Sequence, residues 1–253
     1  MWGMGRGMNA VVDREPPTGF ASTPPSHSRH VPRTLNLTFD DGPDRTWTPL
    51  LLEQLRRCRV SATFFMVGER VLAYPDLPRQ VLAAGHHIQL HCHRHIRHTE
   101  LTEPELLHDS ESALAAFADL GIHPRLWRAP WGVQTEASHR VAERLGLRLV
   151  RWSIDTHDWR GDDPAAMLAR VRPRLHHGGS VLMHDALGPG ATRAGCHTTI
   201  ALVPALVAAA RVRALVLAPM SRPGAWAVDS RDAFAASEFG ARAVDGLVSG
   251  AGR

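Results

Sequence analysis

The sequence contains no lysine and only one tyrosine, and its three cysteines, Cys58, Cys92 and Cys196, have no regular spacing. An odd number of scattered cysteines excludes a disulfide framework and a zinc-ribbon pattern, and it is typical of a reducing compartment. All 29 basic residues are arginines, and they are scattered in ones and twos without interleaved aromatics. The net charge of +4 therefore gives little support to nucleic-acid binding.

Long apolar runs are also absent. No stretch could span a membrane, and residues 1–20 lack the apolar core of a signal peptide. We therefore expect a cytoplasmic protein that binds neither a membrane nor a nucleic acid, and the sequence gives no indication of its oligomeric state. Three segments are expected: a flexible Pro-rich leader over 1–33, a main domain over 34–220, and an Ala/Gly-rich extension over 221–253.

One stretch, 35–43, alternates apolar and polar residues and ends in Asp40-Asp41-Gly42-Pro43. The alternation predicts a strand with one face on a core, and because Gly-Pro ends the strand, both aspartates should lie where it emerges into a loop. Adjacent carboxylates repel each other, and a cation bound to one of them relieves the repulsion. An ordinary Asp-Asp-Gly turn is the alternative interpretation.

Strand and helix patterns alternate along the rest of the main domain. Further strands are expected over 62–68, 87–90, 125–127, 147–154, 180–183 and 215–217. Helices are expected to begin at Thr48-Pro49, to run through 79–84, to begin at a Thr102–Glu105 capping box, and to occupy 135–145, a stretch from 163, and 198–210. The alternation predicts a parallel sheet, and about seven units favour a (β/α) barrel.

Polar residues stand directly after five of the expected strands: Asp40-Asp41, His91, Arg128, Asp155 and His184. In a parallel barrel these positions share one rim, where the active sites of such folds lie. The sequence therefore predicts that residues far apart in the chain meet at one site.

His91 and His95 are four residues apart, so on a helical turn both imidazoles would face the same way. With one carboxylate they would form a two-His, one-carboxylate metal site that leaves open positions for water and substrate. The same segment contains four further histidines, His86, His87, His93 and His98. A His-rich loop without a metal is therefore the alternative.

Five motifs in order resemble those of the NodB-type polysaccharide deacetylases, carbohydrate esterase family 4, and look most like the chitooligosaccharide deacetylases. They are Thr38-Phe39-Asp40-Asp41-Gly42-Pro43, His91-Cys92-His93-Arg94-His95, Arg128-Ala129-Pro130-Trp131-Gly132, Asp155-Thr156-His157-Asp158-Trp159 and Val181-Leu182-Met183-His184-Asp185. The resemblance covers about 35–219. It implies a distorted (β/α) barrel of about seven parallel strands and a divalent metal, most often zinc or cobalt. The implied activity is metal-dependent removal of the N-acetyl group from an N-acetylglucosamine-type sugar, which releases acetate and a free amine.

The same resemblance implies a role for single residues. The implied metal ligands are Asp41, His91 and His95. The implied catalytic residues are Asp40 as general base, His184 as general acid, Arg128 beside Asp40, and Asp158 beside His184. The implied substrate-binding residues are Pro130, Trp131 (whose backbone N–H would stabilise the oxyanion), Trp159 and Leu182. Asp155 is expected to support Arg128. Two alternatives stay open: Leu182 as an ordinary core residue, and Trp159 as an aromatic that only packs.

Cys92 stands where the family usually has Ser or Thr, and a thiol is a poorer hydrogen-bond partner than a hydroxyl. Cys92 as a fourth ligand is an alternative, and the Gly-rich segment 186–199 is expected to shape the substrate groove. The expected substrate is a soluble chitooligosaccharide or an aminosugar intermediate of a secondary metabolite. The rival functions are an inactive carbohydrate-binding relative, a His-rich metal-binding protein, and a hydrolase of a non-sugar amide.

Overall fold

A computed structural model describes residues 32–220 of the chain. The predictions of a leader over 1–33 and of an extension over 221–253 therefore concern residues outside this range, apart from 32 and 33. Within it, no helix has the length and apolar character needed to cross a bilayer.

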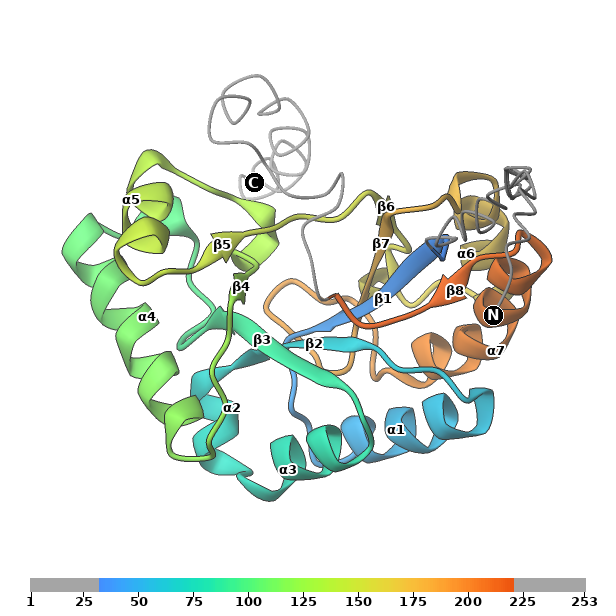
Figure 1. Cartoon of the computed structure of the whole chain (residues 1–253), viewed down its shortest axis with the longest axis horizontal. Helices are drawn as coiled ribbons and strands as arrows, with labels where there is room; N and C mark the ends of the chain where they lie inside the picture. Colours follow the sequence, from blue (N-terminus) through green and yellow to red (C-terminus); the bar gives the residue numbers. More distant parts are fainter. Residues whose placement is uncertain (1–31, 221–253) are drawn as a thin grey trace, which may run out of the picture. The chain divides into compact units, whose positions relative to one another are not determined.

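The described residues form one parallel sheet in which a path of seven strands runs in the order β5-β4-β3-β2-β1-β7-β6 (Figure 1). These strands are β1 (Thr34–Asp40), β2 (Thr63–Val67), β3 (His87–Cys92), β4 (Leu126–Trp127), β5 (Arg148–Leu149), β6 (Ile154–Asp155) and β7 (Gly179–His184). A further strand, β8 (Val216–Leu217), pairs with the start of β1, whereas β2 pairs with its end. The predicted parallel sheet is confirmed.

The connection between the two end strands shows that the sheet curls. Only residues 150–153 separate β5 from β6, and an extended chain across this connection reaches at most about 18 Å. Seven strands side by side in a flat sheet would span about 29 Å. The sheet therefore closes partly on itself into a half-barrel, which confirms the expected distorted barrel (Figure 1).

The expectation of one strand over 147–154 is wrong. The Val150 N–H still donates to the carbonyl of Trp127 next to β5, whereas the Ser153 N–H donates to the carbonyl of Ser180 in β7. The chain thus leaves one end of the sheet and joins the other within four residues. Apolar residues recur at intervals of one or two positions on both sides of the change, so the sequence pattern could not reveal it.

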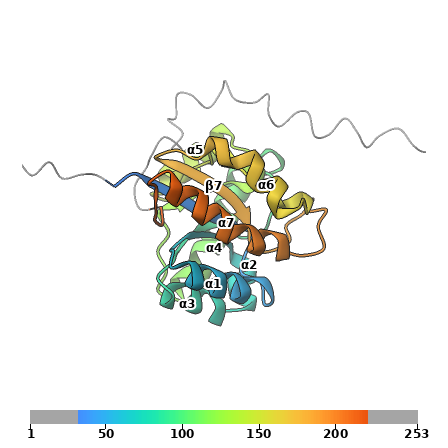
Figure 2. The same cartoon turned by 90° about the vertical axis from the view of Figure 1, so that its right-hand side faces the viewer.

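Seven helices in the described part of the chain cover the outer face of the sheet (Figures 1 and 2). They are α1 (Trp47–Cys58), α2 (Gly68–Ala73), α3 (Asp76–Ala83), α4 (Glu103–Ala118), α5 (Glu136–Arg144), α6 (Pro164–Val171) and α7 (His197–Val212). Single 3₁₀ turns occupy His98–Glu100, Pro130–Gly132, Asp158–Arg160 and Arg172–Arg174. The sequence patterns did not predict α2, which begins directly where β2 ends.

The strand β1, which ends at Asp40, is buried on both faces. Leu37 and Phe39 belong to the main apolar core between the sheet and the helices. Thr38 and Asp40 point the other way, into the barrel, and are buried as well. The alternation that predicts one face on a core is therefore correct, and the polar face is a second, interior surface rather than a solvated one.

The start of α1 differs from the prediction. Thr48 is not its N-cap, because the helix begins at Trp47, and the carboxylate of Asp44 accepts the N–H groups of Thr46 and Trp47. The Thr48 hydroxyl instead donates to Asp185 at 2.6 Å. The predicted capping box of Thr102 and Glu105 at the start of α4 is confirmed.

Candidate functional site

The carboxyl ends of the strands bring the predicted rim residues together. Asp40 ends β1 and lies in register with His184, which ends β7. Arg128 follows β4, and its N–H continues the ladder to the carbonyl of Leu90 in β3. The register between β2 and β3 shifts at His91, so that β3 has one extra residue there. A bulge of this kind changes the direction in which a side chain points.

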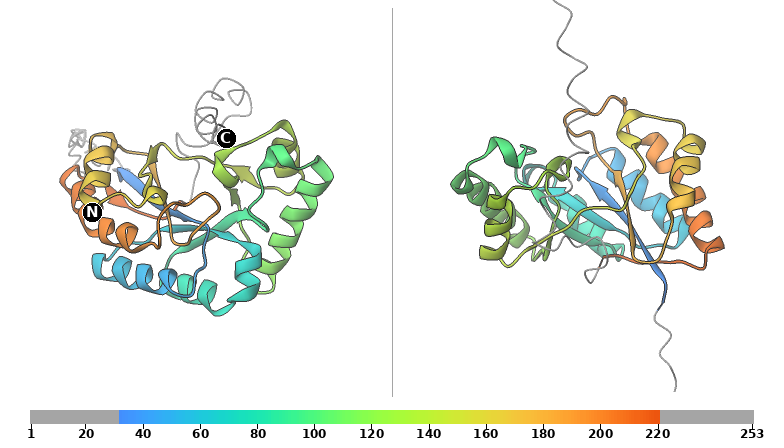
Figure 3. Two further views of the ribbon diagram at one scale, coloured as in Figure 1. Left: turned by 180° about the vertical axis from the view of Figure 1, so that it is seen from behind. Right: turned by 90° about the horizontal axis from the view of Figure 1, so that it is seen from above.

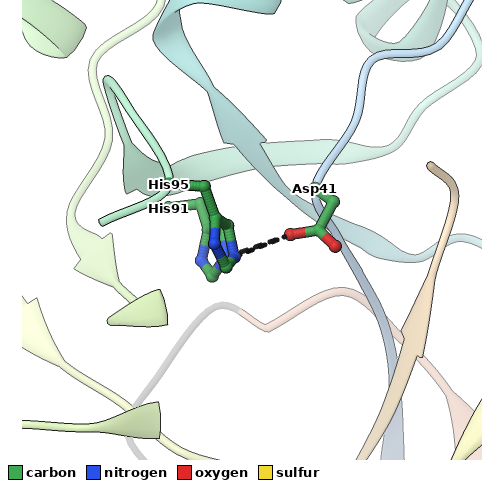
Figure 4. Close-up of side chains that lie close together, drawn as sticks. All are labelled: Asp41, His91 and His95. Carbon is green, nitrogen blue, oxygen red and sulfur yellow. Dashed lines mark ion pairs between the residues drawn. The ribbon is translucent and has the colours of Figure 1, made fainter. Parts of the chain in front are cut away.

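Asp41, His91 and His95 form a compact group at this rim (Figure 4). Asp41 Oδ1 lies 3.3 Å from His91 Nε2 and 3.1 Å from His95 Nε2. Asp41 adopts a left-handed backbone conformation with φ of 75°, which turns its side chain away from the direction of the strand. Within the part of the chain that the structure describes, no other three acidic, His or Cys side chains come this close.

The hydrogen bonds around this group show that it fits a cation. His91 Nδ1 lies 2.7 Å from the carbonyl oxygen of Arg128, which can only accept, so Nδ1 carries the proton and Nε2 presents a lone pair. That lone pair faces Asp41 Oδ1, a buried oxygen with no hydrogen-bond partner among the described residues. A positive charge between the two atoms, either a proton on Nε2 or a metal cation, removes their repulsion, and two imidazoles with one carboxylate are a donor set that zinc and related divalent metals use.

The electrostatics of Asp41 agree with this fit. Burial would raise the pKa of Asp41, but the imidazoles of His91 and His95 and the charge of His184 hold it well below its usual range. The carboxylate is therefore ionised at neutral pH. A divalent cation requires this form of the ligand.

The two histidines do not share a helical turn, and this part of the prediction is wrong. His91 belongs to β3, whereas His95 lies in a segment without helix or strand geometry. The ring centroids are nevertheless 5.0 Å apart. The spacing of four residues is met by a strand end and the loop that folds back beside it.

On one side of the triad, Asp40 forms a buried ion pair with Arg128. Arg128 Nη1 donates to Asp40 Oδ1 at 2.7 Å and to the Thr38 hydroxyl at 2.8 Å, and Nη2 lies 3.3 Å from the Ser180 hydroxyl. The guanidinium also lies 4.0 Å from the ring of Phe65. Burial lowers the pKa of Arg128, and the charge of Asp40 opposes this effect.

Asp155 does not support Arg128 by direct contact. Its carboxylate accepts the N–H of His157 at 2.7 Å and lies 3.2 Å from the ring of that residue. Burial lowers the pKa of Arg128, and Asp155 opposes this through its charge alone.

On the other side of the triad, Asp158 fixes His184. His184 Nδ1 lies 2.7 Å from Asp158 Oδ1, and the backbone N–H of His184 donates to Asp158 Oδ2 at 2.9 Å. Burial would lower the pKa of His184, but the charge and hydrogen bond of Asp158 raise it to about 9. Burial would raise the pKa of Asp158, but His184 and Arg193 lower it to about 2. The pair is therefore an imidazolium and a carboxylate at neutral pH.

Arg193 was missed by the sequence analysis. It is buried, and Nη1 donates to Asp158 Oδ2 at 2.9 Å, while Nη2 donates to the carbonyls of His184 and Ala186 at 3.2 and 3.1 Å. The Thr199 hydroxyl donates to the same Asp158 oxygen. A lone arginine between small residues carries no sequence signal that separates it from a surface arginine.

The segment after β7, expected to shape the substrate groove over 186–199, passes close to the triad at one point. A Cβ at Gly188 would collide with the Asp41 carboxylate, so the backbone approaches the triad closely there. In Figure 3 this orange segment lies beside the loop after β1. A cavity of about 400 Å³ opens next to the triad and is lined by Asp41, His95, Arg70, Arg94, Gly188 and Pro189.

The four predicted substrate-binding residues lie in different environments. Trp131 is 37% exposed. Its ring and that of His95 are T-shaped to each other, with centroids 4.2 Å apart. Trp159 directly follows Asp158, and the guanidinium of Arg160 lies over its ring, 4.9 Å from the ring centroid. Pro130 and Leu182 are buried. Leu182 belongs to neither apolar cluster, because its neighbours in β7 face the helices while Leu182 faces the inside of the barrel.

The alternative of Cys92 as a ligand finds no support. The group of metal-ligating side chains does not include it. Burial raises the pKa of the Cys92 thiol well above its usual value, and the nearby charges of Asp109 and Asp41 raise it further. A protonated thiol in this position packs as a small apolar side chain.

Comparison with protein families matches residues 27–150 to the polysaccharide deacetylase model. The chitooligosaccharide deacetylase of Bradyrhizobium sp. is 35% identical over 167 residues, which cover 64% of this chain and 74% of that protein. The peptidoglycan-N-acetylglucosamine deacetylase PgdA of Listeria monocytogenes is 34% identical over 154 residues, which cover 60% of this chain. The aligned part spans only 32%, about a third, of that longer relative.

A solved structure agrees in fold. The family 4 carbohydrate esterase of Streptomyces lividans, determined in complex with acetate, superimposes with a TM-score of 0.69 at 29% sequence identity. The match covers 77% of this chain and 96% of the esterase. The half-barrel described above is thus shared over nearly the whole of that enzyme.

Proposed function

Since the chain belongs to the polysaccharide deacetylase family, we propose that it is a metal-dependent hydrolase that removes the N-acetyl group from an N-acetylglucosamine-type sugar. The products would be acetate and a free amine. The observation that carries the proposal is the position of the Asp41–His91–His95 group, with the Asp40–Arg128 pair on one side and the Asp158–His184 pair on the other.

Asp41, His91 and His95 would hold the metal, and we propose zinc, with cobalt as the alternative. When bound, such an ion polarises the amide carbonyl and lowers the pKa of water at the site toward ~7. The hydrogen bond from His91 Nδ1 to the Arg128 carbonyl fixes the tautomer and the ring orientation in which the Nε2 lone pair faces Asp41.

Asp40 would act as the general base and take a proton from the attacking water. Arg128 holds the carboxylate in place at 2.7 Å and cannot itself take that proton, because its guanidinium stays charged. The backbone N–H of Trp131 would stabilise the oxyanion formed by the attack, by analogy with the family.

His184 would act as the general acid. When the C–N bond breaks, the sugar nitrogen needs a proton to leave as an amine, and the imidazolium supplies it. Asp158 holds Nδ1 at 2.7 Å, so that Nε2 is the nitrogen that can deliver the proton. With its pKa at about 9, His184 is protonated before each turnover at neutral pH.

The substrate we propose is a soluble chitooligosaccharide or an aminosugar intermediate of a secondary metabolite, acted on in the cytoplasm. Relatives act on chitooligosaccharide and on peptidoglycan, as their names state. Trp131 is partly exposed and has the guanidinium of Arg97 4.3 Å over its ring, and we propose that it contacts the sugar together with Trp159. Leu182 would contact the acetyl methyl.

The test is incubation of the zinc- or cobalt-loaded protein with acetylated oligosaccharides and aminosugars, followed by mass spectrometry and an acetate assay. We expect each product to be lighter by one acetyl group exchanged for hydrogen, with one acetate released per product. Chelator-treated protein and the Asp40→Asn variant are the controls. Retention of a sugar without acetate release would indicate an inactive carbohydrate-binding relative, and turnover of simple acetamides alone would indicate a non-sugar amidase.

A further inference from the structure

The two histidines of the triad are held in different ways. His91 lies in β3, and its Nδ1 is fixed by the carbonyl of Arg128. His95 lies outside the helices and strands, and its buried Nδ1 has no hydrogen-bond partner among the described residues. The position of the His95 ring therefore depends on whatever fixes the backbone between the two histidines.

Asp109 fixes that backbone. Its Oδ2 accepts the N–H of His93 at 2.9 Å, and its Oδ1 accepts the N–H of Arg94 at 3.1 Å. Two of the three backbone N–H groups between the histidines are thus bound by one carboxylate, and Asp109 is only 3% exposed. The Arg94 side chain, half exposed, lies 3.5 Å from the same carboxylate and adds little to it.

The helix that carries Asp109 is itself firmly placed. Asp109 lies in the middle of α4, whose Leu106 and Phe117 are buried in the main core. At Gly68, where α2 begins, a Cβ would lie 2.9 Å from the backbone of Ala113 in α4, so the two helices are in close contact. Asp109 therefore ties the loop of His95 to a rigid part of the molecule.

We propose that Asp109 is a positioning residue for the metal, which it never touches. Its carboxylate holds the backbone at 93–94 so that His95 Nε2 points at Asp41 Oδ1 and His91 Nε2. Without the Asp109 carboxylate, the loop would become ordered only when the metal binds. The entropic cost of ordering it would weaken the affinity for the metal. The proposal rests on the metal-dependent function above.

Asparagine is the sharpest substitution because it keeps the shape and removes one acceptor. An amide offers one carbonyl oxygen, and its NH₂ group would face one of the two backbone N–H groups. Groups that orient metal ligands from outside typically contribute 10–100-fold to metal affinity. We expect Asp109→Asn to weaken zinc binding by about this factor.

The experiment measures zinc affinity of the full chain by competition with a chromophoric chelator. Asp119→Asn is the matched control, because Asp119 is exposed at the end of the same helix and the change in charge is identical. The control should bind zinc within about twofold of the unmodified protein, since Asp119 supports no ligand. The d–d absorption of the cobalt-loaded Asp109→Asn variant should also change, because a displaced His95 alters the ligand field. Circular dichroism verifies that each variant is folded.

Wild-type-like zinc affinity in a folded Asp109→Asn protein would overturn the proposal. If the asparagine variant does not fold, Asp109→Glu gives the same test, because it keeps both acceptors and the charge but shifts them by one methylene. The same weakening is then expected, and unchanged affinity would count equally against the proposal. If the unmodified protein itself fails to bind zinc or cobalt, the proposed function fails, and the inference about Asp109 fails with it.

Discussion

The two ion pairs that flank the triad have nearly the same geometry and opposite chemistry. In each, a buried carboxylate lies 2.7 Å from a nitrogen of a cationic side chain, Asp40 from Arg128 and Asp158 from His184. A guanidinium does not release its proton in a protein, so in the first pair only the carboxylate can exchange one. An imidazolium can release its proton, and in the second pair the carboxylate only holds it.

The two pairs also differ in what positions them. The Asp40–Arg128 pair lies inside the barrel, where the ends of β1 and β4 fix both backbones. The Asp158–His184 pair depends on a 3₁₀ turn and on Arg193, which comes from the segment after β7. We therefore expect the acid half of the site to respond to substitutions in a loop, and the base half to respond to substitutions in strands.

The largest effect is expected at Asp40. Asp40→Asn removes the proposed base and leaves the three proposed metal ligands in place, so turnover should fall by ~10²–10⁴ while zinc affinity is retained. Steady-state kinetics and the chelator competition measure the two quantities. A variant with near-normal turnover would show that the base has been assigned to the wrong half.

A loss of similar or smaller size is expected for His184→Asn, and it should depend on the leaving group. An N-acetyl sugar needs a protonated amine as leaving group, so its turnover should fall by ~10²–10⁴. An aryl acetate ester releases a stable phenolate without a proton, so its hydrolysis should fall much less. Asp40→Asn should slow both substrates alike, and equal losses for both substrates in His184→Asn would contradict its role as the acid.

A third effect concerns pH. Asp158 raises the pKa of His184 to about 9, so Asp158→Asn should lower that pKa, and NMR titration of metal-free protein measures it. The raised pKa contributes stability that is fully present below the ordinary pKa of about 6.5 and is lost as the pH rises through about 9. Denaturant unfolding should therefore show wild-type stability declining over this window, with a flatter profile in the variant. Identical profiles would rule out the pair as the cause.

The smallest effect is expected at Arg193. Arg193→Met leaves Asp158 held by His184 and Thr199 but releases the segment after β7, so we expect turnover to fall by about tenfold and the melting temperature to drop by several degrees. Arg174→Met, an exposed arginine on the chain between α6 and β7, is the matched control. If both variants behave alike, the acid half does not depend on its loop.

The sequence predicted well where a local rule and the tertiary environment agree. Alternation placed Asp40 and Asp41 at the end of a strand, and a Thr–Glu pair marked the start of α4. It failed over 147–154, where apolar residues recur on both sides of a change of sheet edge. It also failed at His91 and His95, where a helical spacing is met by a bulged strand end and a loop. Periodicity describes one element at a time and gives no information about the next one.

Two residues that matter for the site had no sequence signal at all. Asp109 looks like a polar residue on an amphipathic helix, and Arg193 looks like a surface arginine in a Gly-rich loop. Both are buried, and both bind backbone groups near the triad or the acid. The backbone groups that they bind, and the Asp158 carboxylate, lie 7 to 35 positions away along the chain, so no local pattern could identify them.

The sequence by itself determined the strand–helix alternation, the rim where the polar residues meet, and which residues we propose hold a cation or move a proton. Side-chain chemistry at strand ends carries that information, because parallel strands bring their carboxyl ends to one edge. Only the tertiary structure decided which partner fixes each group: the Arg128 carbonyl for His91, Asp109 for the loop of His95, and Arg193 for Asp158. These contacts join residues that are far apart in the chain and meet only when it folds. The energy of each contact depends on burial, which only the packed molecule provides.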